Sequence, residues 1–93
     1  MAKVTLTGTL LCATSQDAAL VAAHVPDHIR LTRAEPGCLH FDVAPKANPL
    51  IWEVNETFVD RAAFDAHQTR TKASAWAALT AHIPRDFAIS EQA

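Results

Sequence analysis

The order in which strand-like and helix-like patterns follow one another constrains the fold of this chain more than any other feature. Stretches rich in β-branched, aromatic and apolar residues predict strands, and stretches with apolar residues every three to four positions predict helices. The predicted strands cover residues 3–13, 38–44, 51–59 and 86–90, and the predicted helices cover about 15–34, 60–67 and 72–82. This βαββαβ order, with its second helical region split, predicts an α+β fold of the ferredoxin-like class, in which helices cover one face of an antiparallel sheet.

Length and composition exclude several classes of protein. The 93 residues predict a single domain, residues 1–93, with a core between about residues 3 and 90. The formal charge is -2, and the 8 Lys and Arg residues are scattered, so no nucleic-acid partner is expected. No apolar run approaches the ~20 residues that span a bilayer, and no leader pattern follows Met1. We therefore expect a cytoplasmic protein with no membrane partner.

The first predicted strand carries no charge on either face after Lys3, which predicts a central strand. Gly8 in its middle indicates a bulge or a close approach by another part of the chain. In the helix that follows, Ser15 is the expected N-cap, and Pro26 predicts a kink or break near residues 22–25. The expected packing stripe of this helix consists of Ala18, Val21, Ala22, Val25, Ile29 and Thr32.

Alternation assigns the side chains of the next two strands to faces. In the second strand, Leu39, Phe41 and Val43 are expected in the core, with Cys38, His40 and Asp42 opposite. In the third, Trp52, Val54, Glu56 and Phe58 share one face and Ile51, Glu53 and Asn55 the other. The sheet face without helices would expose Thr5, Thr7, Leu11, Trp52 and similar residues, so we expect a second copy of the chain to cover it.

A short helix after the third strand is expected to carry a histidine into the interior. Asp60 is a suitable N-cap, and Ala63, Phe64 and His67 follow on one helix face. Because Phe64 must enter the core, His67 is expected there too. An acidic strand followed by an inward imidazole predicts the wall of a small polar pocket.

Two segments resemble the antibiotic biosynthesis monooxygenase (ABM) domain family. They are Glu35-Pro36-Gly37-Cys38-Leu39-His40-Phe41-Asp42-Val43 and the stretch from Trp52-Glu53-Val54-Asn55-Glu56-Thr57 to Asp60-Arg61-Ala62-Ala63-Phe64-Asp65-Ala66-His67. The resemblance implies a dimeric α+β barrel of two ferredoxin-like protomers. It also implies one of the family's known activities, which include cofactor-free oxidation of phenols and quinols, haem degradation and isomerisation of a small sugar-like signal molecule.

Departures from the family pattern argue against some of these activities, haem degradation among them. Haem-degrading relatives use an Asn on the first strand, which this chain lacks, and Asn55 stands where an aromatic residue is common. The chain has no tyrosine, which excludes a mechanism that needs a phenolic side chain. The resemblance therefore favours a cofactor-independent monooxygenase that oxidises a quinol or other phenolic small molecule, an aromatic substrate, with O2. A non-catalytic small-molecule-binding or stress-related module, and an isomerase or lyase, are the alternatives.

Such an oxygenase needs a base, donors that hold the resulting anion, and a dry pocket. We expect His67 as the base or anion-holding group, Glu53 as a second base and Asn55 as a donor. Expected substrate contacts are Trp52, His40, Phe64 and Trp76.

Structural roles for the same residues remain open. His67 could be a core histidine bonded to a carbonyl or to Glu53, and Glu53 could instead pair with Arg61. Asn55 could be a surface amide, His40 and Asp42 an exposed pair, and Trp52 and Trp76 core or dimer contacts. His24 and His28 have the i, i+4 spacing of zinc ligands but no third ligand nearby, so no metal site is expected. Cys12 and Cys38 are expected to be buried, reduced thiols.

Overall fold

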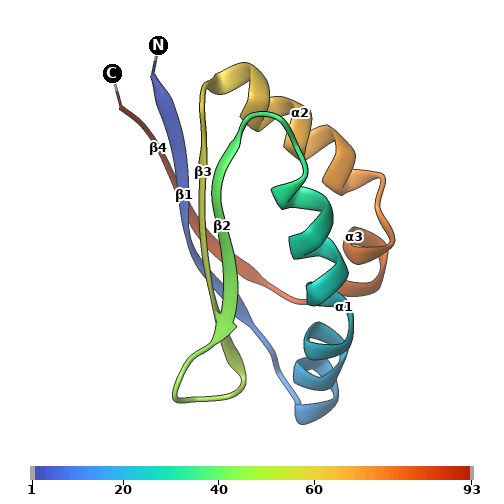
Figure 1. Cartoon of the computed structure of the whole chain (residues 1–93). Helices are drawn as coiled ribbons and strands as arrows, with labels where there is room; N and C mark the ends of the chain where they lie inside the picture. The colour runs from blue at the N-terminus through green and yellow to red at the C-terminus, as the bar shows by residue number, and fades with distance from the viewer. Residues whose placement is uncertain (1, 93) are drawn as a thin grey trace.

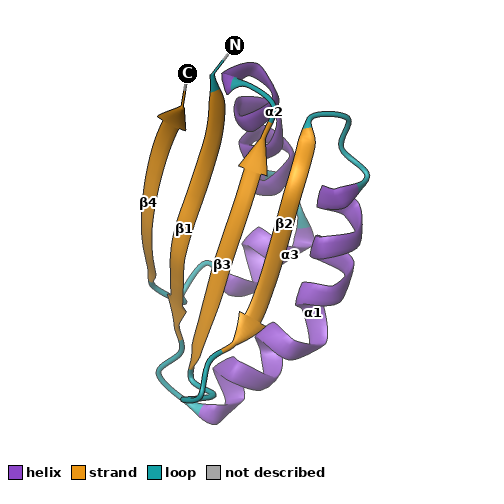
Figure 2. Ribbon diagram, turned by 60° about the vertical axis from the view of Figure 1, so that its left-hand side comes forward, coloured by secondary structure: helices purple, strands orange, loops and turns teal. Residues whose placement is uncertain are grey.

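The computed structural model describes residues 2–92 and has the predicted ferredoxin-like order of elements, with one antiparallel sheet and three helices (Figure 1). The elements are β1 (Lys3–Leu11), α1 (Ser15–Arg33), β2 (Cys38–Pro45), β3 (Ile51–Phe58), α2 (Arg61–Lys72), α3 (Ala75–Thr80) and β4 (Arg85–Gln92). The strands form one sheet in the order β2-β3-β1-β4, with β4 and β2 at its edges (Figure 2). All three helices lie on the same face of this sheet. No helix within residues 2–92 combines the length and apolar character needed to cross a membrane.

The core lies between the sheet and the helices. Every second residue of β3 faces it, and Trp52, Val54, Glu56 and Phe58 are all buried, as the alternation predicted. The expectation that Trp52 is exposed on the open face is wrong, because its side chain belongs to this inner set and is only 8% exposed. The remaining core is formed chiefly by Val4, Leu6 and Leu10 of β1, Val21 and Val25 of α1, Phe41 and Val43 of β2, Phe64, Trp76 and Ile83.

The beginning of β2 differs from the predicted alternation. Phe41 and Val43 are buried as expected, but Leu39 is 53% exposed and Cys38 is partly buried against the core. The pairing register of β2 with β3 shifts between Cys38 and His40. Since a bulge offsets the two-residue alternation, the residues before it exchange faces relative to the prediction.

Helix α1 is continuous from Ser15 to Arg33, so the predicted break at Pro26 is absent. Pro26 leaves the carbonyl of Ala22 without its helical partner, and both residues are exposed, so water can satisfy that carbonyl. The N-cap is Thr14 rather than Ser15, and its Oγ1 accepts a hydrogen bond from the Asp17 backbone N–H at 3.1 Å. On the packing face, Ala22 is exposed and His28 is buried instead.

Helix α2 and strand β4 run further than the sequence predicted, whereas α3 is shorter than the predicted 72–82. Asp60 caps α2 as expected, accepting a bond from the Ala63 N–H at 2.8 Å, and the helix continues past His67 to Lys72. Ser74 caps α3. Strand β4 extends to Gln92 because it pairs with β1 along almost its whole length.

Gly8 allows β1 and β4 to approach closely, as its mid-strand position suggested. A Cβ at this position would lie 2.1 Å from the Asp86 carbonyl oxygen and 2.8 Å from the Phe87 Cα. Both are backbone atoms, so β4 would have to move away from β1.

We expect Gly8→Ala to lower the free energy of unfolding by about 3 kcal/mol, at the upper end of the usual cost of overpacking. Urea denaturation measures this loss. Thr7→Ala on the same strand is the control, because Thr7 is exposed and its truncation should cost less than about 1 kcal/mol. Equal losses in the two variants would contradict the steric explanation.

Candidate active site

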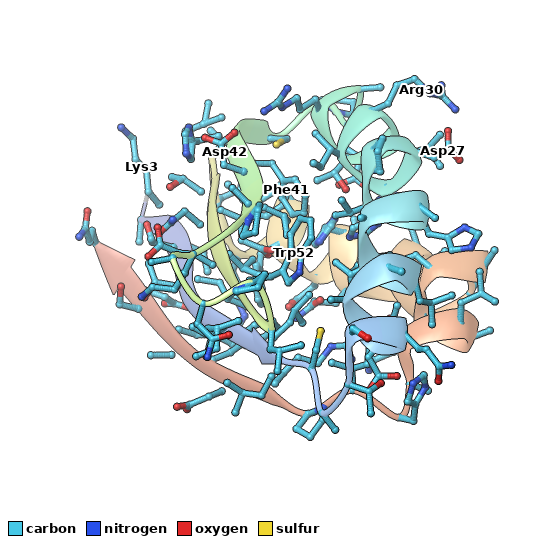
Figure 3. All side chains as sticks on the ribbon, turned by 90° about the horizontal axis from the view of Figure 1, so that it is seen from below. Lys3, Asp27, Arg30, Phe41, Asp42 and Trp52 are labelled. Atoms are coloured by element: carbon cyan, nitrogen blue, oxygen red, sulfur yellow. The ribbon has the colours of Figure 1, made fainter. Side chains whose placement is uncertain are left out.

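A cavity of about 120 Å³ lies between the inner face of the sheet and the helices. Its apolar walls include Leu6 and Leu10 of β1, Val54 of β3, Phe41 of β2 and Trp76 of α3. Figure 3 shows Phe41 and Trp52 pointing from the sheet toward the helices, whereas Asp42 points away. Polar groups enter the cavity wall from four elements: His28 from α1, Glu56 from β3, His67 from α2 and Arg85 from β4. A mostly apolar pocket with a few converging polar groups is the usual form of a small-molecule site.

His67 of α2 is 3% exposed and is fixed from two sides. Its Nδ1 lies 2.9 Å from Oε1 of Glu35, and its ring stacks on Phe58 with centroids 4.8 Å apart. Glu35 is itself held by a hydrogen bond from Nε of Arg70, whose Nη2 also donates to Thr32 Oγ1 at 2.9 Å. An ionised carboxylate can only accept, so Nδ1 of His67 carries the proton and Nε2 keeps its lone pair.

Glu56 of β3 presents its carboxyl to that lone pair. It is 5% exposed, and its Oε1 lies 3.7 Å from His67 Nε2. Oε1 has no hydrogen-bond partner among the described residues. A buried carboxyl with no partner needs an explanation, and a ligand that completes the site supplies one.

The protonation states of this pair favour proton transfer near neutral pH. Burial, with a smaller contribution from the charge of Glu35, raises the pKa of Glu56 to about 7. Burial lowers the pKa of His67 below its ordinary value, although Glu35 acts in the opposite direction. Both pKa values are thus shifted toward the neutral forms, so the two groups do not form a permanent ion pair. A carboxyl that titrates near 7 beside a neutral imidazole can accept the proton of a phenol.

His28 of α1 is a third buried polar group in the cavity wall, and it is 6% exposed. Its ring stacks on Trp76 with centroids 5.0 Å apart and planes within 8°. Burial, followed by the positive charges of neighbouring residues, lowers its pKa to about 4. Its Nδ1 has no partner within residues 2–92.

We expect His28 to make the protein less stable in acid. The unfolded chain binds this proton near pH 6.5 and the folded chain near 4, so the residue's contribution is complete above 6.5 and is lost as the pH falls to 4. The loss is about 3 kcal/mol. His28→Phe keeps a ring against Trp76 and should lack this loss when urea unfolding is compared at pH 7 and pH 4.5. His24→Phe on the exposed side of α1 should follow the wild type; identical pH dependence in both variants would contradict the assignment.

The structure brings together some of the predicted site residues. His67 and Trp76 both line the cavity. Phe64 is 2% exposed and packs edge-on against Phe58, and Trp52 is buried further along β3 with its Nε1 unpartnered among residues 2–92. Neither Phe64 nor Trp52 reaches the cavity wall.

Glu53, Asn55 and His40 lie on the opposite face of the sheet from His67. Asn55 donates to Glu53 at 3.2 Å, Lys46 lies 3.6 Å from Glu53, and His40 pairs with Asp42 at 3.0 Å. These side chains therefore do not meet His67 within one chain. Their roles in binding or catalysis stay predictions.

Sequence reasoning did not select Glu56, Glu35, His28 or Arg85 for the site. For Glu56 a signal was present, because alternation placed this carboxylate among three large apolar residues on the inner face. The contact between Glu35 and His67 joins positions 32 residues apart, and local patterns carry no information about it.

Within the part of the chain that the structure describes, no group of three or more His, Cys, Asp or Glu residues is placed to bind a metal ion. Cys12 is buried and Cys38 partly buried, and both are free thiols. Burial raises the pKa of both thiols. They are therefore less reactive at neutral pH than an exposed cysteine.

Comparison with known proteins identifies the family to which the chain belongs. The family model for antibiotic biosynthesis monooxygenases matches residues 10–79, and the chain therefore belongs to this family. The comparison with curated proteins finds no match.

Similar solved structures agree with this assignment of the fold. A Nitrosomonas europaea protein named for the same family is 24% identical, with a TM-score of 0.75 and 95% of each chain covered. A protein of unknown function from the same organism is 26% identical, with a TM-score of 0.78, covering 98% of this chain and 89% of that one. A conserved protein from Methanosarcina mazei is 17% identical, with a TM-score of 0.79. The match covers 100% of this chain and 95% of that one.

Proposed function

We propose that this protein is a cofactor-independent monooxygenase that oxidises a quinol or related phenol in the cavity between the sheet and the helices. The observation that carries the proposal is the buried pair of Glu56 and His67 at the wall of an otherwise largely apolar cavity. Membership of the ABM family makes oxygen chemistry of this kind a reasonable expectation.

The residues supply the first step of such a reaction. The substrate hydroxyl transfers its proton to the Glu56–His67 pair, and Glu35 stabilises a protonated His67 through Nδ1–H. The resulting anion is rich enough in electrons to reduce O2 directly. For a benzoquinol, one O2 gives a hydroxybenzoquinone and one water. One oxygen atom is inserted into a ring C–H bond, the other leaves as water with the two hydroxyl hydrogens, and the quinol supplies all four electrons.

The cavity walls suit the remaining steps. Leu6, Leu10 and Val54 exclude water from the anion, which strengthens every electrostatic interaction with it. Phe41 and the stacked rings of Trp76 and His28 offer flat surfaces to an aromatic substrate.

The proposed functional unit is a homodimer formed through the open face of the sheet. This face presents Thr5, Thr7 and Thr9 of β1 together with Leu11, which is 40% exposed. A partner sheet would bury these groups and could bring Glu53, Asn55 and His40 close to a second chain. Sedimentation equilibrium should give twice the 10.1 kDa chain mass, and a monomer at micromolar concentration would refute this arrangement.

Oxygen uptake tests the activity. Chelator-treated wild-type protein is mixed with a panel of quinols, and uptake is compared with the uncatalysed rate while the product is identified by mass spectrometry. We expect uptake to persist after chelation and one oxygen atom from ¹⁸O2 to enter the product. Slow tautomerisation without oxygen uptake would instead identify an isomerase, and ligand binding without turnover would identify a binding module.

A further inference from the structure

Arg85 differs from the other arginines of the chain in its partners. Four of the five arginines form ion pairs with carboxylates: Arg30 with Asp27, Arg33 with Asp42, Arg61 with Asp65 and Glu91, and Arg70 with Glu35. Arg85 forms no ion pair with a carboxylate of residues 2–92. It is also the arginine that lines the cavity.

Neutral acceptors hold the Arg85 guanidinium in place. Its Nη1 donates to the carbonyl oxygens of Thr80 and Ile83, both at 2.6 Å, and its Nη2 donates to Thr80 Oγ1 at 2.7 Å. These three bonds fix the orientation of the group without neutralising it. Of the five N–H groups of an arginine, one on Nε and one on Nη2 remain, which is the number that a carboxylate accepts in a two-bond pair.

The surroundings of Arg85 favour an anion. Burial lowers the pKa of this guanidinium, because part of its hydration is lost. Phe87 lies beside it in the cavity wall and is 38% exposed, on an edge strand. Arg85 is nevertheless exposed enough for a ligand to reach it. A reachable cation with no carboxylate partner among residues 2–92, next to an aromatic side chain, is suited to an aromatic anion.

Arg85 and Glu56 lie at different ends of the cavity. Arg85 pairs with Leu10 of β1 and Glu56 pairs with Leu6, from the two opposite sides of that strand. The two backbone positions are thus separated by two strand spacings, about 10 Å, and by four residues along the strand, about 13 Å. A ligand that reaches both groups carries polar atoms at its two ends.

We propose that the cavity selects an anionic aromatic substrate, with a phenolic hydroxyl at Glu56 and His67 and a carboxylate bound by Arg85. The phenolic end rests on the proposed function, whereas the carboxylate end is an independent property of the cavity. Arg85 would then be the residue that determines specificity. The attraction between Arg85 and the carboxylate also holds the substrate in one orientation, with the hydroxyl directed inward.

Matched acids and amides test this inference without oxygen. Binding of 4-hydroxybenzoate and 6-hydroxy-2-naphthoate, and of the corresponding amides, is measured by calorimetry at pH 7.5 and low ionic strength. We expect the better-fitting acid to bind about 10-fold more tightly than its amide, as charge-assisted pairing with an arginine predicts. Equal affinities of acid and amide in the wild-type protein would overturn the inference.

Variants then assign the preference to Arg85. Arg85→Gln should bind acid and amide equally, and amide binding that persists in this variant shows that the cavity is intact. Arg85→Lys keeps the charge and should retain a several-fold preference, so it tests the inference even if the glutamine variant does not fold. Arg61→Gln removes the same charge from the surface and should keep the full preference. A preference that persists in Arg85→Gln would exclude this residue.

The two proposals fail in different ways. A preference for acids without any oxygen uptake would leave the anion site standing and refute the monooxygenase. Uptake that is equally fast with phenolic acids and with their amides would leave the monooxygenase standing and refute selection by Arg85.

Discussion

Replacing Glu56 with glutamine is expected to lower kcat/KM for the oxidation of a quinol about 100-fold, the scale of losing a general base. Glutamine has nearly the same shape, so the cavity should keep its form, but an amide cannot accept the substrate proton. Steady-state oxygen uptake measures the change. Retention of more than half of the wild-type kcat/KM would contradict a role of Glu56 in proton transfer.

The pH dependence of kcat/KM is a second test of the same variant. Because the pKa of Glu56 is raised to about 7, the wild-type kcat/KM should rise with pH and level off above that value. The rising limb should be missing in Glu56→Gln. His67 cannot supply this limb, because its pKa is lowered and the ring is already neutral at pH 7.

Stability should change in the direction opposite to activity. The folded protein holds the Glu56 proton up to about pH 7, whereas the unfolded chain releases it near 4.5. The free energy of unfolding therefore falls as the pH rises between these values, by about 3 kcal/mol. Glu56→Gln lacks this fall and should be more stable than the wild type at pH 8. The comparison must be made between variant and wild type, because His28 acts in the opposite direction below pH 6.5.

Glu53→Gln is the matched control for the activity measurements on Glu56→Gln. Glu53 lies on the same strand, three residues earlier, and undergoes the same chemical change on the other face of the sheet. If the reaction takes place in the inner cavity, only Glu56→Gln should lose activity. Loss in Glu53→Gln alone would instead support a site on the open face, as the sequence-based assignment of Glu53 and Asn55 requires.

The contrast between these two glutamates shows where sequence reasoning succeeds. Strand alternation correctly separated Glu53 from Glu56, because the side-chain period of a strand is a local property. Which face carries the helices is set by the whole topology. Trp52 was therefore wrongly expected on the open face, although alternation had placed it beside Val54, Glu56 and Phe58. The inner position of His67 was predictable for the same local reason, since Phe64 shares its helix face.

The parts that sequence could not predict depend on tertiary contacts. The bulge at the start of β2 exchanges Cys38 and Leu39 because of how β2 pairs with β3. Gly37 approaches α2 closely, where an added Cβ would lie 2.2 Å from the Ala63 Cβ, and Glu35 lies two residues earlier in the same turn. The partner of His67 likewise comes from a distant segment, 32 residues earlier, so the electrostatics of the site become visible only in the folded chain.

Replacing His67 is the second change with a large expected effect. His67→Ala removes the imidazole whose Nε2 faces Glu56, and oxygen uptake should fall about 100-fold. Added imidazole should restore part of the activity in this variant, because it can enter the vacated space and accept a proton. Rescue of this kind separates a chemical role from a purely structural one, since a packing defect would not respond to a base.

His67→Gln distinguishes proton transfer from the orientation of neighbouring groups. Its amide N–H can still donate to Glu35, so the buried carboxylate is not left unpaired, yet it provides no base at neutral pH. We expect a loss similar to that in His67→Ala but without rescue by imidazole. Because Glu56 and His67 are proposed to act together in one proton transfer, the double variant Glu56→Gln/His67→Gln should lose little more than either single one. Multiplicative losses would show instead that the two residues act in separate steps, with Glu56 or His67 serving only to bind the substrate.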